Sequence, residues 1–149
     1  MKYIFQFIIA AFATYGFTIY FKLPYKVRTV TSCLSGVIWV IYEFLLNDTN
    51  NYIISGLIAS ILIGLCSEIL AIYYKKPATV FSLPCLIPLV PGAGMYYIMY
   101  YFIDSNYNMM TTSLINTVLT TTALALGIIS SQATFRLIRQ IIKTKRDPR

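Results

Sequence analysis

Five long apolar stretches, separated by short polar connections, divide the 149 residues of the chain. An α-helix needs about 20 predominantly apolar residues to cross the hydrocarbon core of a bilayer. The pattern therefore predicts an all-α membrane protein, a single transmembrane domain of five helices in the lipid bilayer, followed by a basic cytoplasmic tail over residues 136–149. We place the spans near residues 3–21, 29–46, 52–74, 80–103 and 111–135.

The fourth span, VFSLPCLIPLVPGAGMYYIMYYFI, carries Pro84, Pro88, Pro91, Gly92 and Gly94 near its centre. Each internal proline removes one helical hydrogen bond and costs about 3 kcal/mol in an unbroken helix. Irregular backbone at bilayer depth persists only where it is buried in protein or lines a watery cavity. We therefore predict a helix that is broken at this Pro/Gly motif and forms a binding site. The alternative is a structural kink stabilised by neighbouring helices.

Composition and charge support a membrane protein and give it an orientation. The chain is 58% hydrophobic and 11% charged, and its net charge is +7. Every Lys and Arg except Lys2 lies on one side of the predicted spans, so the positive-inside rule places the N-terminus outside and the C-terminus in the cytoplasm. A re-entrant fourth segment would place the basic tail outside, so we interpret this segment as one broken crossing. Because the basic residues form short clusters between apolar runs, we expect no nucleic-acid binding.

The predicted break exposes polar backbone groups to the membrane interior. The missing proline amides deprive earlier carbonyls, such as those of Pro84 and Ile87, of their usual helical partners. If a new half-helix begins after Pro91, the amides near Gly92, Ala93 and Gly94 are free and lie at the positive end of its dipole. Such amides suit a carboxylate, while free carbonyls suit an ammonium group or a cation. An amino acid carries both charges.

Gly56, Ser60, Gly64 and Glu68 recur every four residues in the third span and share one helical face. Small residues at this spacing favour close helix packing. Glu68 lies about 10 Å from Lys75 along the axis and is still within the bilayer. An ionisable group there is a candidate proton carrier. Equally, it fits a structural ion pair with one of the basic residues on the cytoplasmic side, namely Lys22, Lys26, Arg28 or Lys75.

Polar residues also mark the second and fifth spans. One face of the fifth carries Ser113, Asn116, Thr117, Thr120, Gly127 and Ser131. This stripe favours an interhelical hydrogen-bond surface over the wall of a solute path. Hydroxyls can bond back to the preceding turn, but the amide of Asn116 cannot do so as easily, and we include it among the substrate-binding candidates. Glu43 in the second span either snorkels to the outer interface or belongs to a solute pathway.

The remaining candidate chemistry is sparse. The sequence has no His and no close Cys cluster, so we expect no metal, no cofactor and no enzymatic activity. It also has no Gly-rich phosphate-binding loop with its Lys, so we expect no ATP hydrolysis. Cys33, Cys66 and Cys85 fit packing roles inside spans. Residues Ala11 to Ala13 resemble a signal-peptide cleavage site, but the apolar run continues to Phe21, which favours a retained span.

The stretch LPCLIPLVPGAGMYY, preceded by AIYYKKPATVF, resembles the signature of the small five-span subunit of the threonine/serine exporter family. FKLPYKVRTV after the first span and the Thr-rich last span are similar in kind. The resemblance implies export of small amino acids or related carboxylates across the bacterial cytoplasmic membrane. It also implies a partner, a larger five-span membrane subunit of the same family, and a set of residues that form the substrate site, namely Pro88, Pro91, Gly92, Ala93, Gly94 and Tyr97.

A five-span unit that starts outside is inverted relative to one that starts inside, so two such units would form the inverted repeat common among secondary transporters. The sequence thus predicts a subunit of a secondary exporter for a small-molecule substrate. The alternative is a non-transporting scaffold or assembly subunit that uses its small-residue faces to bind other spans. A homo-oligomer is a further possibility for the assembly.

Overall fold

The computed structural model describes the backbone of residues 2–146 and the side-chain surroundings of residues 2–138. Over these residues the chain is helical apart from short connections, as the sequence predicts. The elements in chain order are α1 (Lys2–Tyr20), α2 (Tyr25–Thr49), α3 (Tyr52–Tyr74), α4 (Thr79–Leu86), the short 3₁₀ helix η1 (Ile87–Leu89), α5 (Gly92–Ile103) and α6 (Tyr107–Arg146).

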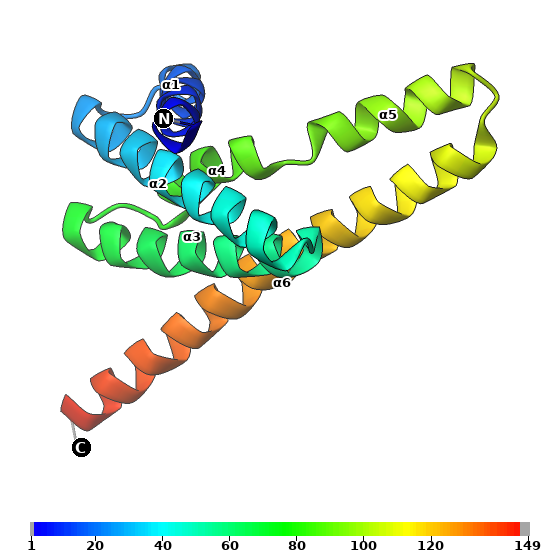
Figure 1. Ribbon diagram of the computed structural model, residues 1–149. Coiled ribbons are helices and arrows are strands. Elements are labelled where there is room, and N and C mark those ends of the chain that lie inside the picture. Colours follow the sequence, from blue (N-terminus) through cyan, green and yellow to red (C-terminus); the bar gives the residue numbers. More distant parts are fainter. Residues whose placement is uncertain (1, 147–149) are drawn as a thin grey trace.

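Helices α1 to α4 form a packed body, and α6 crosses it as a long diagonal (Figure 1). Helix α2 packs on α1 and α3, while α3 packs most extensively on α6. Helix α5 packs on α6, and this hairpin extends beyond the body. The core lies where α2, α3, α4 and α6 meet; its buried members are Ile38, Ala59, Ile63, Cys85, Leu89 and Leu124.

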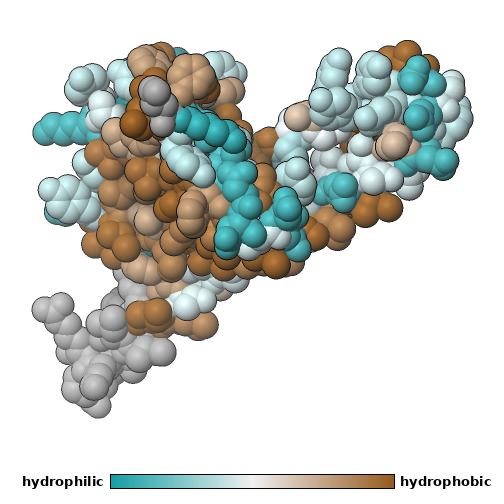
Figure 2. All heavy atoms as spheres, in the orientation of Figure 1, coloured by the Kyte–Doolittle hydropathy of each residue, from teal (hydrophilic) through white to brown (hydrophobic). Residues whose placement is uncertain are grey.

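Four helices, α1, α2, α3 and α6, are long and apolar enough to cross a membrane. The pair formed by residues Thr79–Leu89 and Gly92–Ile103 is also apolar enough, and its two halves meet at a bend of 43°. Hydrophobic side chains cover much of the body, while hydrophilic ones form separate groups at its left edge, over the centre of the view and at the far end of the α5–α6 hairpin (Figure 2). The chain is therefore a multi-pass membrane protein.

Helix α6 continues without interruption beyond residue 135, where the predicted fifth span ends. Hydropathy marks where the apolar stretch stops, whereas Arg, Lys and Gln are good helix formers and carry the helix on to Arg146. The first part of the predicted basic tail is thus helical. Residues 147–149 of that tail lie outside the described residues.

Small residues join α3 to α6. A Cβ added to Gly64 would overlap the Ser131 hydroxyl, and one added to Gly127 would overlap the Ser60 hydroxyl. The small residues on this face of α3 therefore act in close helix packing. Residue numbers rise together along this α3–α6 seam, so the two helices run parallel.

Candidate functional site

The backbone leaves the helical conformation between α4 and α5, within the Pro/Gly motif. Helix α4 contains Pro84 and passes into η1, which ends at Leu89. Val90 is extended, with φ −60° and ψ 126°, and Pro91 has φ −74° and ψ 62°. Helix α5 begins at Gly92, so its N-terminus lies at the interruption.

Local 3₁₀ bonding supplies new partners for the carbonyls before the break. The Ile87 amide donates to the Pro84 carbonyl, and the Val90 amide donates to the carbonyls of Leu86 at 3.1 Å and Ile87 at 3.3 Å. The prediction that the Pro84 and Ile87 carbonyls are free is therefore wrong. Prolines remove the α-helical donors, but the tighter turn brings other amides within reach.

The amides after the break are satisfied only in part. The Gly92 amide donates to the Val90 carbonyl at 2.7 Å, so the prediction that this amide is free is wrong. The first amide of α5 with an acceptor one turn back is that of Met95, which donates to Pro91 at 3.3 Å. No acceptor among the described residues pairs with the amides of Ala93 and Gly94. These two donors remain at the positive end of α5.

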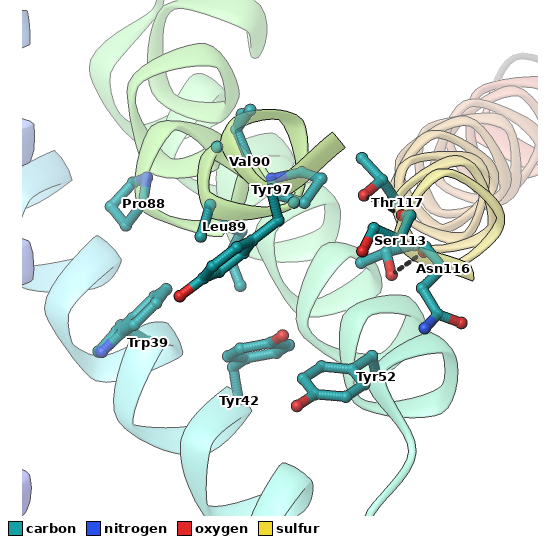
Figure 3. Close-up of a pocket in the computed structure, with 15 residues that line it drawn as sticks. Trp39, Tyr42, Tyr52, Pro88, Leu89, Val90, Tyr97, Ser113, Asn116 and Thr117 are labelled. Atoms are coloured by element: carbon teal, nitrogen blue, oxygen red, sulfur yellow. Dashed lines mark hydrogen bonds between the residues drawn. The ribbon is translucent and has the colours of Figure 1, made fainter. Parts of the chain in front are cut away.

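A cavity of about 390 Å³ lies beside the interruption, between the C-terminal half of α2, the start of α3, and the facing sides of α5 and α6. Tyr97 reaches across it toward Trp39, and Ser113 and Asn116 lie on the α6 side (Figure 3). The residues that line it are Trp39, Tyr42, Tyr52, Pro88, Leu89, Val90, Pro91, Gly92, Ala93, Gly94, Tyr97, Ser113, Asn116, Thr117 and Thr120.

Every residue predicted to bind substrate lines this one cavity, including Asn116, which is far from the motif in sequence. The residues predicted from the sequence did not include the aromatic side of the cavity, which Trp39, Tyr42 and Tyr52 form. Trp39 and Tyr42 lie one helical turn apart, with ring centroids 5.6 Å from each other, and Tyr52 begins the next helix. Their helical spacing in the sequence was the available signal, but only the packing of α2 and α3 shows which way that face points.

The two glycines of the α5 N-terminus have different surroundings. Gly92 lines the cavity, and a Cβ added to it would meet no atom within 4 Å. A Cβ on Gly94 would overlap the Thr117 hydroxyl and approach Thr117 Cβ and Cγ2 at 3.3 Å. Gly92 thus leaves space for the cavity, whereas Gly94 allows α5 to approach α6 closely.

The hydroxyl stripe of α6 does not form the predicted interhelical hydrogen bonds among the described residues. Thr117 and Thr120 donate to the carbonyls four residues earlier, at 2.7 Å each, and Thr121 does the same at 2.8 Å. A threonine hydroxyl in an apolar environment finds its nearest acceptor in its own preceding turn. The stripe instead contributes Ser113, Thr117 and Thr120 to the cavity wall.

Glu68 lies in a second, larger cavity of about 700 Å³ near the C-terminal end of α3. Three cationic residues line the same cavity, namely Lys75, Lys76 and Arg136. Of the four basic residues considered as ion-pair partners of Glu68, Lys75 is the one that lines this cavity. Thr120, which lines the cavity at the break, lies near Gly56, and Glu68 is 12 residues beyond Gly56, which is about 18 Å along the helix at 1.5 Å per residue. The proton-carrier candidate is therefore remote from the cavity at the break. Glu43 lines neither cavity.

Within the described residues, no group of three or more His, Cys, Asp or Glu side chains is placed to hold a metal ion. Cys85 is buried and its thiol donates to the Thr31 carbonyl at 3.4 Å, which fits a packing role between α4 and α2. Cys85 does not line the cavity at the break.

Comparison with protein families gives one match, to the model described as Threonine/Serine exporter, ThrE, over residues 6–134. Comparisons with curated proteins and with solved structures gave no match. The matched range includes α2 to α5, the cavity at the break and nearly all of the α3–α6 seam. Because the match covers most of the chain and includes the Pro/Gly motif, this multi-pass membrane protein belongs to the threonine/serine exporter family.

Proposed function

We propose that this chain is one half of a secondary exporter that moves small amino acids, of the threonine and serine kind, or related carboxylates out of the cell. The observation that carries the proposal is the cavity at the interrupted segment, which gathers every predicted substrate-binding residue. Its volume of about 390 Å³ falls within the usual range for small-molecule sites.

The cavity chemistry suits a zwitterion. The unpartnered amides of Ala93 and Gly94, at the positive end of α5, match a carboxylate. The aromatic faces of Trp39, Tyr42 and Tyr97 match an ammonium group through cation–π attraction. Among the residues that the structure describes, no charged side chain lines the cavity. A dicarboxylate would therefore meet no counter-charge there, which favours amino acids over dicarboxylates.

For the topology, we propose five crossings, with the N-terminus outside and α4, η1 and α5 forming one broken crossing. The parallel course of α3 and α6 supports this arrangement, because a re-entrant α4–α5 segment would make α6 antiparallel to α3. The basic residues between α3 and α4 and along the end of α6 then face the cytoplasm. We propose that this membrane is the bacterial cytoplasmic membrane.

For the assembly, we propose that a larger five-span subunit of the same family supplies the other half of the transporter. An odd number of crossings makes the chain an inverted counterpart of a unit that starts inside, and inverted repeats place substrate at their interface. Glu68 is proposed as the proton carrier from its intramembrane position, acting at a distance from the cavity at the break. The competing function is a scaffold that only assembles its partner.

Efflux of labelled threonine from cells that co-express the chain with its larger partner tests the proposal. Gly92→Leu adds a large side chain at a residue that lines the cavity and has open space beside it, and we expect it to abolish efflux while membrane insertion stays normal. Gly92→Ala adds one methyl group at the same position and should retain efflux. Normal efflux by Gly92→Leu, or normal efflux without the chain while the partner complex falls apart, would favour the scaffold.

A further inference from the structure

The second cavity lies where α3 and α6 diverge, at the opposite end of their seam from the cavity at the break (Figure 1). Gly64 lies against Ser131, and one further turn along the parallel helices places Glu68 level with the part of α6 from Gln132 to Arg136. The cavity therefore opens where the close packing of small residues stops.

Charges of both signs line this cavity and differ in depth. Glu68 is only 9% exposed, whereas Lys75, Lys76 and Arg136 are exposed. Glu68 is thus the most deeply buried charged residue of the cavity, and the cationic residues lie nearer the surface. A ligand that enters carboxylate-last would place a positive group against Glu68 and a negative group among the cations. A free amino acid carries one charge of each sign, as this lining requires.

We propose that this cavity is a second binding site, a cytoplasmic vestibule that captures free amino acids before they reach the cavity at the break. Lys75, Lys76 and Arg136 bind the carboxylate, and Glu68 binds the ammonium group through charge-assisted hydrogen bonds. Glu68 thereby makes the vestibule prefer zwitterions over dicarboxylates. The inference rests on the proposed export function, because that function supplies the amino acid and the direction of movement.

The same cations also suit anionic lipid headgroups, which juxtamembrane Lys and Arg attract. The buried carboxylate argues for the zwitterion, because a site for anionic headgroups gains nothing from a negative charge at its inner end. The test below distinguishes a bound amino acid from a bound lipid headgroup by changing the lipid composition.

The test uses the purified full chain in phosphatidylcholine nanodiscs, with two readouts. Labelled threonine and labelled succinate report total binding. Trp39, the single tryptophan of the chain, lines the cavity at the break and reports binding there alone. We expect two components of threonine binding, one that changes Trp39 emission and one that does not. Glu68→Gln should lower the second component about tenfold or more, with succinate binding not lowered. Arg136→Gln should weaken both ligands, and Glu68→Asp should restore part of the threonine preference.

Lys22→Gln is the matched control, because it removes a basic residue that lines neither cavity. Unchanged threonine binding in both Glu68→Gln and Arg136→Gln overturns the vestibule. Loss of threonine binding by the wild type in nanodiscs that contain phosphatidylglycerol also overturns it, because lipid headgroups then hold the cations. If threonine binds the vestibule but never changes Trp39 emission, the result counts against the substrate site at the break and not against the vestibule. The two proposals can therefore be rejected independently.

Discussion

Gly92 and Gly94 lie two residues apart at the start of α5, yet a methyl group would have opposite consequences at the two positions. At Gly92 it enters open space, whereas at Gly94 it meets the side chain of Thr117 on α6. The first glycine therefore affects what the cavity can hold, and the second affects whether α5 stays on α6. A single motif thus combines a binding role and a packing role.

Gly94→Ala should lower the stability of the protein. The added methyl group must either displace the Thr117 hydroxyl from its bond to the Ser113 carbonyl or push α5 away from α6, and overpacking of this kind costs about 1–3 kcal/mol. Thermal unfolding in detergent should show a lower midpoint for Gly94→Ala and an unchanged midpoint for Gly92→Ala. Adding Thr117→Ala should recover part of the loss, because it removes the hydroxyl that the methyl group overlaps. Equal midpoints for the two single variants would contradict the packing role.

At the scale of elements, the α3–α6 seam is the most extensive helix contact and holds the two cavities apart. Gly64→Leu should therefore destabilise the fold more than a glycine replacement elsewhere, since its side chain would have to displace Ser131 on a parallel neighbour. The matched control is Gly16→Leu, where an added Cβ meets nothing within 4 Å. Comparable unfolding midpoints in the two variants would show that the seam tolerates separation.

The bend between α4 and α5 should depend on its prolines. Replacing Pro88 and Pro91 by Ala restores two amide donors and removes the ring clashes, so the two halves should join into a straighter helix. Spin labels at residues 80 and 103, in a cysteine-free background, should then show a longer separation than in the proline-containing chain. An unchanged separation would mean that the surrounding helices, and not the prolines, impose the bend of 43°.

Local sequence rules located the interruption but did not give its hydrogen bonding. Proline and glycine act through their own backbone, so their effect can be read without tertiary structure. The bonds from Ile87 to Pro84 and from Val90 to Leu86 depend on how the chain relaxes around the break, and no pattern of residue types specifies that. Hydropathy likewise marks where the apolar stretch of α6 stops but not where the helix ends, because charged residues can continue a helix in water.

Across the whole molecule, the cavity at the break joins five elements, α2, α3, η1, α5 and α6, which come from three separate parts of the sequence. Asn116 was a candidate because its polarity is unusual within a span, and it lies in the cavity. Trp39, Tyr42 and Tyr52 were missed because aromatic residues near the ends of membrane helices are common as interface anchors. Only the mutual packing of α2, α3 and α6 distinguishes a cavity wall from an interface belt.

The topology makes a prediction for the intact cell. In a chain without its native cysteines, an impermeant thiol reagent should label Ser105→Cys in intact cells and Lys76→Cys only after the cells are opened. These residues flank α4, η1 and α5, so a single broken crossing puts them on opposite sides of the membrane. Labelling of both from the same side would mean that the segment is re-entrant.

We propose that the interrupted helix presents its peptide dipoles to a solute and not to lipid. A high-resolution map of the chain with its larger partner, prepared with threonine, tests this most directly. We predict solute density in the cavity with its carboxylate against the amides of Ala93 and Gly94. A helix that winds continuously from residue 80 to residue 103, with no cavity beside it in the assembled complex, would contradict the account.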